Sequence, residues 1–277
     1  MSGNDLFVSN YDGTAVGEYN ATTGAAISSS LVTGLSSPTA LALSDNDLFV
    51  SNFIGSSRTV GEYNATTGVA INTSFITGLG DPSGLALSGN NLFVSDYPAG
   101  AGVGNTVGEY NATTGAAINA NFITGLNGTE GLALSGNDLF VVNVLADTVG
   151  EYNATTGAVI NASFITGLGD PSGLAVSGND LFLTGGTETS GGVNAVGEYN
   201  ATTGALVNSD FITGIEFPNG IAVASVPEPS PWSMIGVGGV ALLGVMLRKK
   251  HHRIEILSHI HSEIGMAEEF VKPRTKP

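Results

Sequence analysis

Five near-identical segments constrain the fold of this chain more than any other feature. The string Val-Gly-Glu-Tyr-Asn-Ala-Thr-Thr-Gly occurs five times, and its glutamates are separated by 44, 47, 42 and 47 residues. These glutamates are Glu18, Glu62, Glu109, Glu151 and Glu198. Most of the variation falls just before the string, which indicates a surface loop at that point. Self-similarity at this period is typical of architectures in which each repeat packs on its neighbours.

Each repeat divides into four short strand candidates. In the second full unit these are residues 84–87, 92–95, 106–110 and 116–123. Turn-forming Ser, Gly, Asn and Thr lie between them, as in antiparallel hairpins, and helical periodicity is absent from the whole region. Four strands in 42–47 residues is the size of one β-propeller blade. The small Gly and Ala of 84–87 suit the crowded strand nearest the propeller axis.

The two ends of the repeat region predict a closed ring. The chain enters at the second strand of a blade, and the last repeat ends with an extra first strand at 218–223. Joining that strand to residues 4–35 completes a fifth blade and removes open sheet edges. We therefore expect residues 1–225 to form an all-β, five-repeat β-propeller with four-stranded blades, closed by N- and C-terminal strands that share a blade. A β-solenoid is the alternative, but a 44-residue period is long for it.

The repeated residues resemble those of known propeller families. The pattern Pro-Ser-Gly-Leu-Ala-Leu-Ser-Gly-Asn-Asp-Leu-Phe-Val-Ser, followed by Val-Gly-Glu-Tyr-Asn-Ala-Thr-Thr-Gly, resembles NHL-type and gluconolactonase-like repeats over roughly residues 2–224. The resemblance implies the propeller fold. It does not imply one function, since such propellers serve binding, scaffolding and catalysis alike.

A different pattern follows the repeats. A stiff Pro-Glu-Pro linker leads into residues 231–247, which carry no charge. This run is slightly short for a bilayer helix of about 20 residues, but Trp232 and a basic cluster extend it. We predict one transmembrane helix, with the propeller on the periplasmic or extracellular side; a buried core helix is the alternative, disfavoured by the missing amphipathic face. The membrane stop is Arg248, Lys249 and Lys250.

Residues 226–250 resemble the PEP-CTERM sorting signal of Gram-negative bacteria. The resemblance implies an exosortase-like membrane transpeptidase as a partner, and exopolysaccharide or another matrix component as a second partner. Recognition falls on Pro227, Glu228 and Pro229. Two features depart from the family: the N-terminus shows no signal peptide, and a tail of mixed charge follows at 251–277. We expect a signal peptide to be missing from this chain, and the tail to be cytoplasmic or disordered.

Composition excludes several classes of function. Residues 1–226 hold 19 acidic residues and one basic residue, Arg58. A surface this acidic repels phosphates and anionic lipid, so we expect no nucleic-acid partner. The chain has no Cys, and all four His lie after residue 250, so the repeats have no thiolate or imidazole for catalysis or metal binding. We expect no catalytic residue, no metal site and no cofactor.

The repeated polar residues are assigned structural roles. The five glutamates could form a carboxylate ring for a divalent cation, but each lies beside Tyr and far from the predicted channel strand. We therefore expect them to be solvated or hydrogen-bonded. The turn acids Asp5, Asp47, Asp138 and Asp180 are replaced by Asn91 in one repeat, so a calcium ring would be incomplete. The five Asn-Ala-Thr sequons are expected to be turns in which Asn tolerates left-handed geometry.

A functional site breaks the symmetry of a repeat protein, because different blades must supply different groups. The most divergent acids are Glu130 and Glu216, which we align with Pro or Asp of the other repeats, and they lack His or Arg support. We therefore predict a non-enzymatic, surface-anchored or exported structural or binding module of the cell envelope or extracellular matrix. The alternative is a metal-dependent lactone hydrolase on a propeller scaffold.

Overall fold

The computed structural model describes residues 5–10, 13–21, 23–54, 57–97, 105–187, 195–213 and 221. The chain divides into two compact units, residues 1–225 and residues 226–277. The second unit lies outside the described residues, and with it the predicted linker, transmembrane helix, membrane stop and tail. In the part of the chain that is described, no helix is long and apolar enough to cross a membrane.

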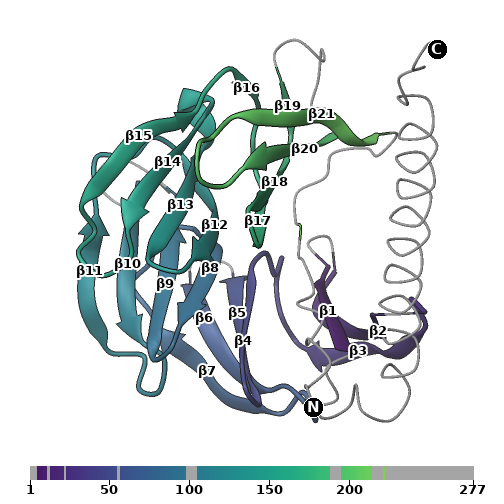
Figure 1. Cartoon of the computed structure of the whole chain (residues 1–277). Helices are drawn as coiled ribbons and strands as arrows, with labels where there is room; N and C mark the ends of the chain where they lie inside the picture. Colours follow the sequence, from purple (N-terminus) through teal and green to yellow (C-terminus); the bar gives the residue numbers. More distant parts are fainter. Residues whose placement is uncertain are drawn as a thin grey trace, which may run out of the picture. The chain divides into compact units, whose positions relative to one another are not determined.

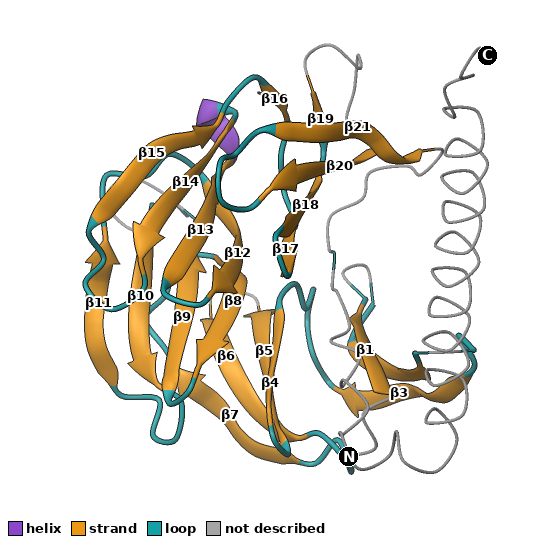
Figure 2. Ribbon diagram, in the orientation of Figure 1, coloured by secondary structure: helices purple, strands orange, loops and turns teal. Residues whose placement is uncertain are grey.

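The described strands of the first unit form five antiparallel meander sheets arranged in a ring (Figures 1 and 2). These are the blades of a β-propeller, numbered here 1 to 5 in chain order, and the predicted all-β five-bladed fold is confirmed. Blade 1 contains β1 (Asp5–Ser9), β2 (Ala15–Asn20) and β3 (Ala26–Thr33). Blade 2 contains β4 (Leu41–Ser44), β5 (Asp47–Ile54), β6 (Ser57–Asn64) and β7 (Ala70–Ile76). Blade 3 contains β8 (Pro82–Ser88), β9 (Asn91–Asp96), β10 (Thr106–Asn111) and β11 (Ala117–Ile123).

Blades 4 and 5 repeat the same order, with small additions. Blade 4 contains β12 (Thr129–Ser135), β13 (Asp138–Asn143), β14 (Thr148–Asn153) and β15 (Val159–Ile165), with the short 3-10 helix η1 (Val144–Ala146) between β13 and β14. Blade 5 contains β17 (Leu174–Ser177), β18 (Asp180–Thr184), β20 (Ala195–Asn200) and β21 (Leu206–Thr213). A two-stranded ladder pairs β16 (Leu168–Gly169) with β19 (Gly186–Thr187). The ladder adds strands beside blade 5 without changing the four-stranded plan.

The predicted closing strand at 218–223 lies outside the described residues, except for Ile221. Ile221 lines the same central cavity as Leu6, Phe7 and Val8 of β1. This position agrees with a strand shared between the two ends of the repeat region. The shared blade itself stays a prediction.

The continuous apolar runs of the second strand are explained by two buried faces on each blade. In β5, Leu48 and Val50 pack against blade 1, whereas Phe49 packs in the cluster shared with blade 3. Analogous clusters join blade 3 to blade 4 and blade 4 to blade 5. Because a blade is covered on both sides, its strands need not alternate between apolar and polar residues. The ring is therefore stabilised by apolar burial between blades.

The conserved turn of the five repeats is built differently from our prediction. In blade 2, the Asn64 Oδ1 accepts hydrogen bonds from the backbone N–H groups of Thr66 (3.1 Å) and Thr67 (2.8 Å). The left-handed residue is Gly68, with φ 69°, so the assignment of left-handed geometry to Asn was wrong. A side chain at Gly68 would also meet the Leu31 carbonyl oxygen at 1.8 Å. The turn thus docks against the outer strand of the preceding blade.

Glycine is required at position 84 of the innermost strand β8, because blade 4 approaches the backbone closely there. A Cβ added at Gly84 would lie 2.2 Å from the carbonyl oxygen of Glu130. The expectation that small residues line the axis is confirmed at this position. The equivalent residue of blade 2 is Ala40, which follows Thr39 in the same way that Gly84 follows Ser83.

We expect Gly84→Ala to destabilise the ring by about 1–3 kcal/mol, because backbone atoms must move to admit the methyl group. For a domain of this size this corresponds to a Tm lower by about 2–4 °C per kcal/mol, measured by circular dichroism. Ala40→Gly is the matched control and should cost only about 0.5–1 kcal/mol through backbone entropy. Equal losses in the two variants would show that the innermost strands are not in tight contact at Gly84.

The faces of blades 1 and 5 that would close the ring are exposed in the described residues. Leu6 and Val8 are 39% and 43% exposed, whereas the equivalent Leu48 and Val50 of blade 2 are 1% and 0% exposed. On blade 5, Phe211 is 46% exposed. We call these two surfaces the seam. On blade 1 it consists of Leu6, Val8 and Tyr19, and on blade 5 of Phe182, Phe211 and Ile212.

The seam carries the same residue types as the closed interfaces. Phe182 and Phe211 form a tilted ring pair with centroids 5.0 Å apart, as Phe49 and Phe75 do at 5.3 Å. Phe75, which blade 3 covers, is only 7% exposed. The seam therefore has the two halves of a fifth interface of the same kind.

Candidate functional site

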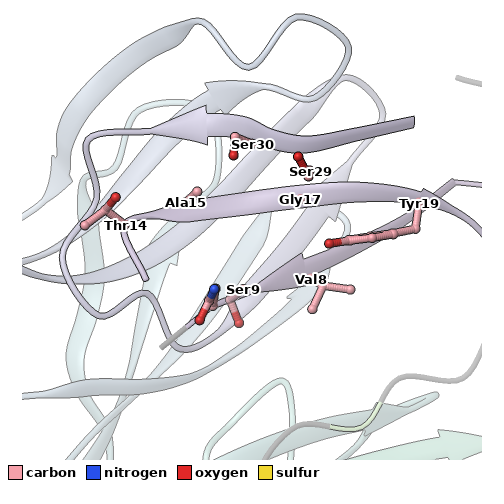
Figure 3. Close-up of a pocket in the computed structure, with 9 residues that line it drawn as sticks. Val8, Ser9, Thr14, Ala15, Gly17, Tyr19, Ser29 and Ser30 are labelled. Carbon is pink, nitrogen blue, oxygen red and sulfur yellow. The ribbon is translucent and has the colours of Figure 1, made fainter. Parts of the chain in front are cut away.

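Two hollows in the first unit are candidate sites. The first, of about 600 Å³, lies on blade 1. Figure 3 shows the Tyr19 ring lying along Gly17, with Val8 on the neighbouring strand. The residues that line this first hollow are Val8, Ser9, Asn10, Thr14, Ala15, Gly17, Tyr19, Ser29 and Ser30. In blade 2 the equivalent tyrosine, Tyr63, is covered by blade 1. We therefore interpret this hollow as part of the seam rather than as a ligand site.

The second hollow is the central channel of the propeller, with a volume of about 650 Å³. It is bordered by the innermost strands β4, β8, β12 and β17, which lie closest to the centre of the ring in Figure 1. Its polar and aromatic lining residues are Phe7, Ser9, Thr39, Phe53, Asp81, Ser83, Tyr97, Glu130 and Ser172. A cavity of this size is within the range of small-ligand sites, so the channel is the candidate functional site.

Hydroxyl groups fix the spacing of the innermost strands around the channel. Each donates a hydrogen bond to a backbone carbonyl of the next blade, and we call this set the hydroxyl girdle. The bonds run from Ser9 to Thr39 (2.6 Å), from Thr39 to Pro82 (3.2 Å), from Ser83 to Thr129 (2.8 Å) and from Ser95 to Glu130 (2.6 Å). Between blades 4 and 5 the Gly131 N–H donates to the Ser172 carbonyl at 3.0 Å. The channel wall is therefore held by polar contacts as well as by packing.

Within blades 2, 3 and 5, a hydroxyl before or on the innermost strand pairs with a hydroxyl of the second strand. Oxygen–oxygen distances are 2.6 Å for Thr39 and Ser51, 3.2 Å for Ser83 and Ser95, and 2.9 Å for Ser172 and Thr184. In blade 4, Glu130 and Val142 stand at these two positions. Our alignment of Glu130 with Pro or Asp of other repeats was therefore wrong. Glu130 replaces a channel-lining Ser or Thr.

Glu130 is the most perturbed acid of the channel. Burial, assisted by the negative charges of Asp170 and Asp81, raises the pKa of its carboxyl to about 7. Among the described residues, no hydrogen bond to this carboxyl is found. Glu130 thus changes its protonation state near neutral pH within the candidate site. Glu216, the other divergent acid, lies outside the described residues.

A second polar group lies beside the channel-lining residues Phe53 and Asp81. The Asp96 carboxylate accepts hydrogen bonds from the backbone N–H groups of Gly80 (2.7 Å) and Asp81 (2.6 Å). Arg58 donates to the Gly80 carbonyl, and its guanidinium carbon lies 4.5 Å from the centroid of the Phe53 ring. Burial raises the pKa of both Asp81 and Asp96, and the Arg58 charge opposes that shift. Arg58 therefore joins the β5–β6 hairpin to the loop before β8.

The repeated glutamates lie away from the channel-lining residues. Glu62 and Glu109 are 9% and 8% exposed, so these two are buried rather than solvated. Burial raises the pKa of Glu62, Glu109 and Glu151, and the charges of Asp47 and Asp138 add to the effect on Glu62 and Glu151. Within the described ranges, no three His, Cys, Asp or Glu side chains are grouped so that they could hold a metal ion.

The sorting and membrane-stop residues predicted from the sequence are not among the described residues. They are Pro227, Glu228, Pro229, Arg248, Lys249 and Lys250. Sequence reasoning identified Glu130 but missed Phe53, Asp81 and Tyr97. One feature of the sequence could have pointed to this part of the channel: Arg58, close to Phe53, is the only basic residue before residue 248.

Comparisons with known proteins show the fold and no family. No family model matches the chain, and no curated protein matches it in sequence. Among solved structures, a chain of a nidogen/laminin complex matches with a TM-score of 0.58 and 13% identity, covering 81% of this chain and 82% of that chain. A streptogramin B lyase matches with a TM-score of 0.58 and 16% identity, covering 81% of this chain and 71% of that chain. One match comes from a protein complex and the other from an enzyme, so this fold accommodates both classes of function.

Proposed function

We propose that this propeller is a non-enzymatic binding module whose ligand enters the mouth of the central channel. One observation carries the proposal: Glu130, which stands where other blades have Ser or Thr, shares one cavity with aromatic and acidic side chains of two other blades. Phe53, Asp81, Tyr97 and Glu130 come from three blades and line one cavity. An asymmetric ligand requires different contacts from different blades, whereas a purely structural ring does not.

The chemistry of the mouth fits a hydroxyl-rich ligand. Phe53 and Tyr97 offer aromatic surface, and Asp81 and Glu130 offer carboxylate oxygens that accept hydrogen bonds from hydroxyl groups. The acidic repeat region disfavours a polyanion. We therefore propose exopolysaccharide or another neutral or cationic matrix polymer as the partner.

The C-terminal sequence supports a location at the cell surface. In this proposal, residues 231–247 hold the chain in a membrane and Arg248, Lys249 and Lys250 stay in the cytoplasm. The motif Pro227-Glu228-Pro229 is presented to an exosortase-like membrane transpeptidase. Display of the propeller outside the cytoplasm then requires an export signal.

Binding is tested with the full chain in mild detergent against neutral, cationic and anionic oligosaccharides. We expect neutral or cationic members to bind, and Phe53→Ala to weaken binding at least tenfold because it removes aromatic contact. Ile118→Ala is the control, since Ile118 is an exposed apolar residue on the outer strand β11. Equal loss in both variants would place the ligand elsewhere. Lactone turnover with calcium, zinc or manganese that Glu130→Gln abolishes would contradict a non-enzymatic role.

The sorting motif gives a separate prediction. When the chain is expressed behind a signal peptide in a host with an exosortase, Glu228→Ala should leave it unprocessed in the membrane fraction, because the central residue of the recognition motif is lost. Glu216→Ala, an acid outside the motif, is the control. Processing that is unchanged by Glu228→Ala would remove the sorting proposal, and a soluble full-length chain would remove the membrane anchor.

A further inference from the structure

Blade 4 replaces both members of the hydroxyl pair found in blades 2, 3 and 5. In those blades the innermost-strand hydroxyl is within 2.6–3.2 Å of a hydroxyl on the second strand, so each is engaged inside the wall. In blade 4 the innermost strand has Glu130 and the second strand has Val142. Glu130 therefore has no second-strand hydroxyl opposite it, and it still lines the channel.

The other charges at the mouth do not compensate Glu130. The nearby charges that act on it are the carboxylates of Asp81 and Asp170. Arg58 is already engaged by the Gly80 carbonyl and the Phe53 ring, and its charge acts on Asp81 and Asp96. Residues 1–226 contain no other Lys or Arg. The charge of Arg58 thus compensates the carboxylates of Asp81 and Asp96, whereas the charges that act on Glu130 are both negative.

Resting on the proposed function, we propose that Glu130 is the specificity-determining residue of the channel mouth and that the preferred ligand is a saccharide carrying a protonated amine. The ammonium group would donate a charge-assisted hydrogen bond to the Glu130 carboxylate. Phe53 and Tyr97 would contact the apolar surface of the sugar ring. The channel volume of about 650 Å³ admits a few sugar units at most, so recognition is local to one amine.

Two matched probes separate charge from shape. They are cellohexaose and its 6-amino-6-deoxy derivative, in which ammonium groups replace hydroxyls on the same skeleton. Binding to the full chain in mild detergent is measured by titration calorimetry at about pH 8, where Glu130 is ionised and an aliphatic amine is protonated. We expect the amino derivative to bind at least tenfold more tightly. Glu130→Gln should abolish this preference, Glu130→Asp should retain part of it, and Asp170→Asn should reduce it less than Glu130→Gln.

Each result decides between the two proposals. If both probes bind equally to the wild type and to Glu130→Gln, the charge proposal is overturned and the binding module stands. If neither probe binds, both proposals fail for saccharides of this kind. If the preference for the amine survives in Glu130→Gln, another group selects the charge and Glu130 is not the determinant. Thermal unfolding of every variant confirms that lost binding does not reflect lost folding.

Discussion

Removing residues 217–226 should lower the stability of the whole ring by about 3–5 kcal/mol, comparable to losing one or two large buried side chains. In the predicted closed ring this segment would supply the innermost strand of blade 1. Without it, blade 1 has an unpaired edge at β1, and the seam residues Leu6 and Val8 lose cover. Thermal unfolding should show a Tm lower by about 6–20 °C, since each kcal/mol corresponds to about 2–4 °C in a domain of this size.

The control for this deletion is removal of residues 98–104, the segment of variable length before the third Val-Gly-Glu-Tyr string. Loop length contributes little to stability, so its Tm should stay within a few degrees of the full chain. Equal Tm values for the two deletions would contradict the closed ring and favour an open stack of blades.

Replacing Glu130 by Gln should stabilise the protein at pH 8 and leave it unchanged at pH 4. The pKa of Glu130 rises from 4.5 to about 7 in the folded state, so folding disfavours the ionised carboxylate. This penalty is absent below pH 4.5, grows between pH 4.5 and about 7, and is complete above pH 7. The shift corresponds to about 3 kcal/mol, which partial solvent exposure reduces to about 1–3 kcal/mol.

The measurement is the difference in Tm between Glu130→Gln and the wild type across this pH range. Asp210→Asn, a change at an exposed carboxyl on β21, should leave Tm within about a degree at every pH. A gain for Glu130→Gln that is the same at pH 4 and pH 8 would show that charge at this site is not the cause.

The blade architecture could be predicted from sequence because its signals are local and repeated. Turn residues such as Gly68 and apolar runs such as Leu48 to Val50 occur in each of five copies, so errors in one copy are corrected by the others. The turn mechanism could not be predicted in detail. The same sequence allows an Asn with left-handed backbone geometry or an Asn whose side chain accepts hydrogen bonds from the turn. Only the structure distinguishes the two.

The candidate site was harder to predict because it depends on register between strands. Blade 4 reads Gly128-Thr129 where others have a residue followed by Pro, so Glu130 could be aligned one position wrongly. The paired channel hydroxyls, such as those of Ser83 and Ser95, are about a dozen positions apart in the sequence. The pairing, and its loss where Val142 replaces the second hydroxyl, therefore cannot be seen without the register of the two strands. Phe53 pairs with Arg58 in the extended β5–β6 hairpin, a pairing that a variable loop in the sequence does not reveal.

The central claim is that ligand binds at the channel mouth, and hydrogen exchange of the full chain tests it most directly. Backbone amide exchange is measured with and without cellohexaose and its amino derivative, at ligand concentrations above the measured Kd. We predict slowed exchange in residues 80–85 and 129–132, which line the channel from adjacent blades, with no change in the outer strand at 117–123. Slowed exchange confined to the outer strand, or to residues 15–19 beside the hollow on blade 1, would contradict the claim.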